Sequence, residues 1–283
     1  MKRSIRNVII TLVILLAVSF AACKAQNTNS GNKDGQQTSA TALPTPLPTP
    51  ESTKMPEIVI DQNTNVPDKK DYTIPKAKKA PAIDGKAGEG EWDGALSISL
   101  DNKNTWNPAG SLVQCQGGTF KYLWDEQGLY LLAEINDANK FAKQPEGNSG
   151  SYNGGDGVQI AIFADSTVTG GAQGKMFFFS FCPKASDGKA YVGEHFTYSD
   201  GQTGKNVPES VIASSETDNG YIVECRVDAA ALARSDPKVL LKEGASFPMI
   251  NVILDVNEIG TQGLFTDSAW FNAPATNVYT LGK

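Results

Sequence analysis

The sequence predicts an all-β fold for residues 76–283, an antiparallel β-sandwich of about ten strands with one short helix. The first observation is that apolar and polar residues alternate in many short runs, each bounded by Gly, Asn, Asp or Pro. Such runs are typical of strands that bury one face. The second observation is that only one short segment has a helical pattern. This pattern argues against a two-lobed α/β solute-binding protein, which needs repeated helix–strand units.

The strands are predicted from the alternation alone. Ala95–Leu100 and Thr119–Trp124 both alternate with period two. Asp125–Gly128 has the composition of a hairpin loop and leads into the apolar run Leu129–Ile135. Four further runs alternate in the same way: Val158–Phe163, Met176–Phe181, Tyr221–Val227 and Phe247–Leu254.

The predicted helix is Asp228–Arg234, which is rich in alanine. Asp228 is placed to cap its first turn, and Pro237 lies beyond its end. We therefore expect one short helix between two strands.

The N-terminus has the pattern of a targeting segment. Three basic residues, Lys2, Arg3 and Arg6, precede the uncharged and mostly apolar run Val8–Ala22. At about 15 residues this run is shorter than the ~20 needed to span a bilayer as a helix, and it fits a secretory signal peptide. Residues 1–22 are therefore predicted to be a signal peptide.

The residues that follow predict a lipid anchor and a spacer. The run ends in Ala21, Ala22 and Cys23, which resembles the lipobox of bacterial lipoproteins and implies that Cys23 carries lipid and becomes the mature N-terminus. Ordinary cleavage near Ala22 is the alternative. Residues 23–75 are rich in Thr, Asn and Pro, a composition that predicts a disordered linker. We expect an extracytoplasmic protein anchored to the cell membrane.

The charges exclude several function classes. The chain has a net charge of −6, and residues 76–283 carry 17 basic and 25 acidic side chains. A folded region of this charge is a poor partner for nucleic acid. The chain contains one histidine, His195, which excludes a His-rich metal site and argues against Ser-His-Asp catalysis.

The cysteines give little information about function. Cys115, Cys182 and Cys225 follow Cys23, and no pair has the CxxC spacing of zinc or redox sites. One disulfide with one thiol left over is compatible with an extracytoplasmic location. Alternation places Cys225 on the apolar face of its strand, which favours a buried thiol.

Five segments, in order, resemble the family 9 carbohydrate-binding modules. They match the family's I-D-G…W opening, its W-D-x-x-x-L-Y hairpin, its D-S-V-E-I-F strand, its G-Y-x-x-E strand and its late tryptophan. The matching residues are Ala82–Gly85 with Trp92, Tyr122–Ala133, Asp156–Phe163, Gly220–Glu224 and Trp270. Together they extend over nearly all of residues 76–283.

The resemblance implies a β-sandwich that binds sugars and has no catalytic activity. In family members the site holds the reducing end of cello- and xylo-oligosaccharides between two tryptophans, and calcium ions support some loops. Structural calcium is therefore the cofactor that the resemblance suggests. Asp137 and Asp156 are loop carboxylates of the type that calcium binds.

The sugar site transfers only in part. Trp270 matches one stacking tryptophan, whereas the position of the other is Asn153, with Tyr152 beside it. The strand Met176–Phe181 offers no equivalent of the family's sugar-binding arginine. Trp106, in a loop-like stretch, is a candidate second platform or lid. Trp92 and Trp124 are predicted to be core, and Asp267 is predicted to be surface.

We therefore expect non-catalytic binding of a cello- or xylo-oligosaccharide, or of a cell-wall glycan, by a monomer. An interaction domain that has lost the sugar site is the alternative. A third hypothesis is haem binding, with His195 and either Met176 or Met249 as axial ligands. The acids Glu89, Glu91 and Asp93 are predicted to be surface rather than a glycosidase pair.

Overall fold

The structure is a computed structural model that describes residues 68–101, 115–137, 155–163, 176–185, 187–195, 205–235, 239–256, 262–268 and 276–283. Its elements are β1 Asp71–Ile74, β2 Leu96–Asp101, β3 Cys115–Trp124, β4 Gly128–Asp137, β5 Gly157–Phe163, β6 Met176–Cys182, β7 Tyr191–His195, β8 Lys205–Asn206, β9 Val211–Thr217, β10 Gly220–Asp228, α1 Ala229–Ser235, β11 Ser246–Val256, β12 Gln262–Thr266 and β13 Val278–Leu281.

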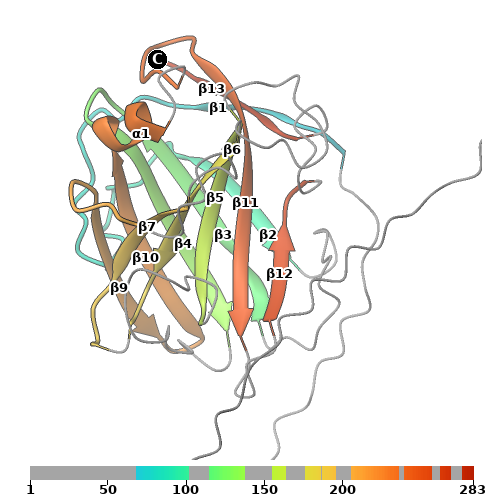
Figure 1. The fold of residues 1–283 in the computed structure, drawn as a ribbon. Helices are drawn as coiled ribbons and strands as arrows, with labels where there is room; N and C mark the ends of the chain where they lie inside the picture. The colour runs from blue at the N-terminus through green and yellow to red at the C-terminus, as the bar shows by residue number, and fades with distance from the viewer. Residues whose placement is uncertain are drawn as a thin grey trace, which may run out of the picture. The chain divides into compact units, whose positions relative to one another are not determined.

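The strands form two sheets, which confirms the predicted β-sandwich (Figure 1). One sheet has five strands in the order β2-β3-β4-β10-β9. The other has eight, in the order β1-β13-β11-β5-β6-β7-β8, with β12 also paired to β11. The ladders are antiparallel except between β1 and β13, which are parallel. The described residues thus hold 13 strands, more than the ten or so predicted; the strands outside the alternating runs named above are β1, β7, β8, β9, β12 and β13.

The first strand lies within residues 23–75, the stretch that the sequence predicts to be linker. It is only four residues long, and its pairing with β13 joins residues about 200 positions apart in the chain. Tyr72 packs against Tyr279, with ring centroids 5.2 Å apart. Asp71–Ile74 alternates polar and apolar residues, but four residues are too few for the alternation to predict a strand, so β1 depends on its pairing with β13.

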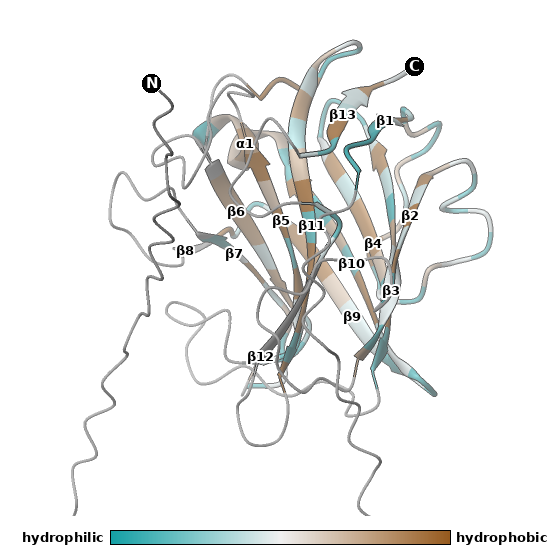
Figure 2. Ribbon diagram, turned by 90° about the vertical axis from the view of Figure 1, so that its right-hand side faces the viewer, coloured by the Kyte–Doolittle hydropathy of each residue, from teal (hydrophilic) through white to brown (hydrophobic). Residues whose placement is uncertain are grey.

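The main core lies between the two sheets. Alternate residues of each sheet point into it, among them Phe120 and Trp124 of β3, Ile160 of β5 and Phe179 of β6. Figure 2 shows these strands as bands of hydrophobic residues. The prediction that Trp124 is a core residue is confirmed, since its side chain is 1 % exposed.

A buried carboxylate joins two of the sequence motifs. One oxygen of Glu224, on β10, accepts hydrogen bonds from the backbone N–H groups of Asp84 (3.1 Å), Gly85 (2.7 Å) and Lys86 (3.3 Å). The other oxygen accepts from Ala87 N–H (3.2 Å) and from the indole of Trp92 (3.0 Å). The I-D-G…W and G-Y-x-x-E motifs therefore meet at one carboxylate, and Trp92 is buried as predicted.

The short helix and the cysteines agree with their sequence patterns. The Asp228 carboxylate accepts a hydrogen bond from Ala230 N–H (2.9 Å), as expected of an N-cap. Cys115, Cys182 and Cys225 are all buried thiols outside any disulfide. Within the described ranges, no helix has the length and apolar character needed to cross a membrane.

Candidate functional site

The eight-stranded sheet has a second apolar face, on the side away from the main core. On β5, Val158, Ile160 and Ile162 belong to the main core. The intervening residues belong to a separate buried cluster, which consists of Ala161, Phe163, Ile250, Val252 and Leu254 with Phe178 packed against it. We call this set the outer cluster. A β-strand exposes one residue in two on each face, so the outer cluster marks the outer face of β5, β6 and β11.

One polar pair lies on this outer face. Gln159 of β5 and Ser180 of β6 are directly opposite in the ladder, and the Gln159 amide donates a hydrogen bond to the Ser180 hydroxyl (2.8 Å). Both side chains are buried, at 5 % and 2 % exposure. An amide and a hydroxyl within an otherwise apolar, buried cluster have the chemistry that binds sugar hydroxyls, while apolar neighbours can cover the C–H faces of a ring.

Sequence reasoning missed this pair. Gln159 occupies the E position of the D-S-V-E-I-F motif, and Ser180 lies in the strand that offers no arginine. The alternation in the sequence is the signal that could have found them, because it places Gln159 and Ser180 on the face of each strand that points away from the main core. The register between β5 and β6, which makes them neighbours, is visible only in the structure.

Three buried carboxylates meet at one end of the sandwich. Asp137 ends β4, Asp156 precedes β5, and Asp255 is the penultimate residue of β11. Their ligand oxygens lie within 4.8 Å of one another, and their exposures are 1 %, 0 % and 0 %. The structure thus brings together the two predicted calcium candidates and adds Asp255, which the sequence prediction did not include. We call these residues the carboxylate cluster.

The carboxylate cluster fits a hard cation. Asp156 accepts a hydrogen bond from Val256 N–H and Asp255 accepts one from Cys115 N–H, both at 2.8 Å. Burial, with the three carboxylates acting in the same direction, raises the pKa of the Cys115 thiol well above its ordinary value. Three carboxylates this close in a buried site are unfavourable unless a cation or protons offset their charge. Oxygen ligands are what Ca²⁺ binds, so these residues fit the ion that the family implies.

The predicted stacking residues lie outside the described residues. Trp106 falls between β2 and β3, and Tyr152 and Asn153 fall between β4 and β5. The segments that contain them begin or end at the carboxylate cluster, because Asp137 ends β4, Asp156 follows Asn153 by three positions, and Cys115 begins β3. A cation there would fix the ends of both segments.

Trp270 also lies outside the described residues, but the chain on both sides of it is described. Asp267 accepts hydrogen bonds from the N–H (3.0 Å) and the side-chain amide (2.6 Å) of Asn251, and from the Tyr279 hydroxyl (3.2 Å). Burial raises the pKa of the Asp267 carboxyl. The prediction that Asp267 is solvated surface is wrong, because this buried carboxylate accepts the backbone N–H of Asn251 and two side-chain donors.

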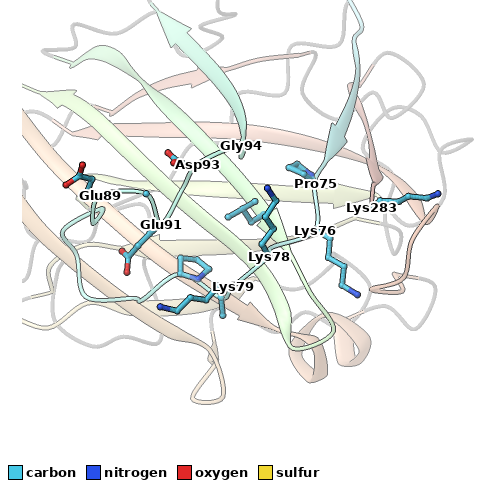
Figure 3. Close-up of a pocket in the computed structure, with 13 residues that line it drawn as sticks. Pro75, Lys76, Lys78, Lys79, Glu89, Glu91, Asp93, Gly94 and Lys283 are labelled. Carbon is cyan, nitrogen blue, oxygen red and sulfur yellow. The ribbon is translucent and has the colours of Figure 1, made fainter.

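A separate cavity of about 530 Å³ lies beside the five-stranded sheet and is lined by charged residues (Figure 3). Lys76, Lys78, Lys79 and Lys283 lie along one side, and Glu89, Glu91 and Asp93 along the other. The residues that line this cavity in the described part of the chain include no aromatic ring, so it does not suit sugar stacking. Glu91 accepts a hydrogen bond from Gly88 N–H (3.0 Å), which gives it a structural role.

One proposed haem ligand is ruled out by its position. Met249 is fully buried in the main core between the sheets. Met176 pairs with Phe163 and His195 with Phe178, on neighbouring strands. Any haem hypothesis therefore depends on these two residues.

The comparisons with known proteins agree with the fold. Residues 83–276 match the family described as carbohydrate family 9 binding domain-like, and the chain belongs to this family. A family 9 carbohydrate-binding module from Caldicellulosiruptor kristjanssonii, solved in complex with cellotriose, is 16 % identical with a TM-score of 0.51. The alignment covers 75 % of this chain and 94 % of that one.

A second solved structure has a comparable fold. It is described as a putative carbohydrate-binding protein from Bacteroides uniformis, and it is 11 % identical with a TM-score of 0.53 over 75 % of this chain and 99 % of its own. A search of curated proteins gives no match. The family assignment confirms the resemblance that the sequence motifs predict.

Proposed function

We propose that this protein is a non-catalytic carbohydrate-binding lipoprotein, held at the cell membrane by lipid on Cys23. Its ligand is a neutral β-linked oligosaccharide of the cello or xylo type, or a cell-wall glycan. The family assignment supports sugar binding, and the C. kristjanssonii relative of similar fold was solved with cellotriose. The signal-like N-terminus supports an extracytoplasmic location.

The observation that carries the proposal is the Gln159–Ser180 pair on the outer cluster. Gln159 stands at the motif position where the family has an acidic residue, and its buried amide is bonded to the Ser180 hydroxyl on the neighbouring strand. In our account Trp270 stacks on one face of the sugar, with Tyr152 or Trp106 opposite and Asn153 beside them. Gln159 and Ser180 bind the hydroxyl rim of the ring.

The carboxylate cluster holds a structural Ca²⁺ in this proposal. Asp137, Asp156 and Asp255 supply carboxylate ligands, and further oxygens come from backbone or water. The ion fixes the ends of the segments that carry Trp106, Tyr152 and Asn153, and takes no part in chemistry.

The test is to titrate residues 24–283 with cellobiose, xylobiose and their alditols in the presence of calcium. Binding is measured by isothermal titration calorimetry. Replacing Gln159 by Leu removes the amide while keeping most of the volume, and we expect it to weaken binding by about tenfold or more. The matched control is Lys79→Ala at the charged cavity, which we expect to bind as wild type.

Two results would overturn the proposal. If Gln159→Leu binds like wild type, the outer face is not the site. If the folded wild type binds none of a panel that also includes cell-wall glycan fragments, the interaction-domain alternative replaces carbohydrate binding. A Soret band in the purified protein would favour the haem hypothesis instead.

A further inference from the structure

The charged cavity lies on the outer face of the five-stranded sheet. Leu123 of β3 lines the cavity and belongs to the buried cluster on this face, together with Trp92. Residues 75–81 form one wall and residues 89–94 form the other (Figure 3). Because the Gln159–Ser180 pair lies on the outer face of the eight-stranded sheet, the cavity and the pair are on opposite faces of the sandwich.

The wall that carries the lysines is fixed to the sheet by its backbone. Ala77 N–H donates a hydrogen bond to the Trp124 carbonyl (2.8 Å), and Trp124 N–H donates one to the Pro75 carbonyl (3.2 Å). Lys78 and Lys79 follow directly after this bridge. Their backbone is therefore held in place, while their side chains extend at the cavity (Figure 3).

The wall that carries the acids is a turn with its own internal hydrogen bonds. The Glu91 carboxylate accepts hydrogen bonds from the N–H groups of Gly88 (3.0 Å) and Ala82 (3.4 Å), and Glu91 N–H donates to the Gly88 carbonyl (3.1 Å). Glu91 thus holds the turn together. Glu89 and Asp93, on either side of it, are exposed.

Two of the four lysines at the cavity have other partners. Lys76 forms an ion pair with Glu126 and lies over the Trp124 ring, with its ammonium 5.3 Å from the ring centroid. The Lys283 ammonium lies 3.9 Å from a carboxylate oxygen of Glu243. Other parts of the protein therefore offset the charges of these two lysines.

Four charged side chains at the cavity remain available to a ligand. Among the residues that the structure describes, Lys78, Lys79, Glu89 and Asp93 take part in no ion pair. Two ammonium groups and two carboxylates thus line one cavity without pairing with each other. An ammonium donates hydrogen bonds to an anion, and a carboxylate accepts them from hydroxyl groups.

We propose that this cavity is a second carbohydrate site, which binds an acidic sugar, a uronate. Lys78 and Lys79 bind the sugar carboxylate, and Glu89 and Asp93 accept hydrogen bonds from its hydroxyl groups. A uronate carries both kinds of group on one ring, and a cavity of about 530 Å³ suits a ligand of about two rings. Binding through charge agrees with a lining that holds no aromatic ring in the described part of the chain.

The acidic wall limits the class of anion that the cavity accepts. A nucleic acid or an anionic membrane presents many phosphates, which Glu89 and Asp93 would repel. A peptide of mixed charge would satisfy both walls, but the chain belongs to a family of carbohydrate-binding domains, which favours a sugar. The inference goes beyond the proposed function, because it concerns another face and another class of sugar.

The experiment titrates residues 24–283 with two acidic disaccharides, digalacturonate and glucuronyl-xylose, and with neutral galactobiose. Amide shifts of Gly90 and Gly94, which line the cavity, report binding in ¹⁵N NMR spectra. The variant is Lys78→Gln with Lys79→Gln, which removes both charges at exposed positions. Lys86→Gln is the matched control, because Lys86 is exposed, lies outside the cavity and has its ammonium 3.6 Å from Asp84.

We expect wild type to bind at least one acidic disaccharide about tenfold or more tightly than galactobiose, with shifts at Gly90 and Gly94. The double variant should bind it about tenfold more weakly, and Lys86→Gln should match wild type. Raising the salt concentration from about 20 to about 200 mM should also weaken binding to wild type, because salt screens exposed charges.

Three results would overturn the inference. The first is equal affinity of wild type for acidic and neutral disaccharides, or binding of neither. The second is equal affinity of wild type and the double variant for the acidic disaccharide. The third is displacement of that disaccharide by an equal concentration of inorganic phosphate or of the dipeptide Lys-Glu, since the cavity would then bind charge without recognising the sugar.

A parallel titration of wild type with cellotriose separates this inference from the proposed function. Binding of the acidic disaccharide without binding of any neutral glycan would contradict the proposed function alone. Binding of cellotriose without binding of either acidic disaccharide would contradict the second site alone.

Discussion

Replacing Glu224 by glutamine tests how the two motifs at its carboxylate stabilise the fold. The carboxylate accepts five N–H hydrogen bonds and is fully buried. The glutamine amide keeps one oxygen and turns the other position into a donor. If the remaining oxygen faces Asp84, Gly85 and Lys86, the new NH₂ group faces Ala87 N–H and the Trp92 indole, which lose their acceptor.

Each buried donor without an acceptor costs about 1–3 kcal/mol, and the remaining bonds lose the strengthening effect of charge. We expect Glu224→Gln to lower the free energy of unfolding by about 3–5 kcal/mol. For a domain of this size that corresponds to a fall in Tm of roughly 6–20 °C.

The assay is urea unfolding followed by tryptophan fluorescence, with circular dichroism as a second probe. Glu216→Gln is the matched control, since Glu216 lies on the neighbouring strand β9 and forms an exposed ion pair with Lys184. We expect that control to change stability by less than about 1 kcal/mol. A loss below 1 kcal/mol for Glu224→Gln would refute the reasoning.

Three further predictions concern the metal, a carboxyl and a thiol. Saturating calcium should raise the Tm by roughly 5–10 °C, and Asp255→Asn should abolish this rise while Asp187→Asn keeps it; an identical Tm with calcium and with EDTA would contradict the metal site. The raised pKa of the Asp267 carboxyl means that the folded state binds this proton more tightly than the unfolded state does. The contribution of Asp267 to the free energy of unfolding is therefore largest below the ordinary pKa of the carboxyl and falls as the pH rises through the folded-state pKa. Urea unfolding in calcium-free buffer at a series of pH values should show this fall in wild type and a smaller fall in Asp267→Asn. Burial raises the pKa of Cys182 to about 12. In a Cys115→Ser, Cys225→Ser variant at pH 8.5, Cys182 should therefore react with iodoacetamide roughly a thousandfold more slowly when folded than when unfolded in urea. Equal rates would show that the thiol is accessible and that its pKa is not raised.

The alternation in the sequence predicts the sandwich because the two faces of a strand meet different surroundings. β5 and β11 are buried on both faces and alternate between the main core and the outer cluster. Tyr221–Val227 and Phe247–Leu254 lie within β10 and β11, and Thr119–Trp124 lies within β3. β1 and β13 are not predicted, because each has four residues and is ordered by pairing. β13 pairs with β11 and β1 pairs with β13, so the position of β1 depends on a partner strand about 200 positions away in the chain.

The candidate site is predictable only in part, because it depends on which strands are neighbours and in what register. The sequence identifies Asp137 and Asp156 singly as loop carboxylates, but their approach to Asp255 depends on which strands are neighbours. Gln159 and Ser180 become a pair only through the β5–β6 register. The polar sequence neighbours of Asp267 predict a surface position, whereas its hydrogen-bond partners Asn251 and Tyr279 lie 16 and 12 positions away.

The most direct test of carbohydrate binding is the affinity of residues 24–283 for cellotriose, compared between wild type and Trp270→Ala with calcium present. Alanine removes one stacking face, and the account predicts that cellotriose affinity falls by about tenfold or more while the Tm stays close to that of wild type. Equal affinity in the two folded proteins would contradict the claim that Trp270 stacks on the sugar.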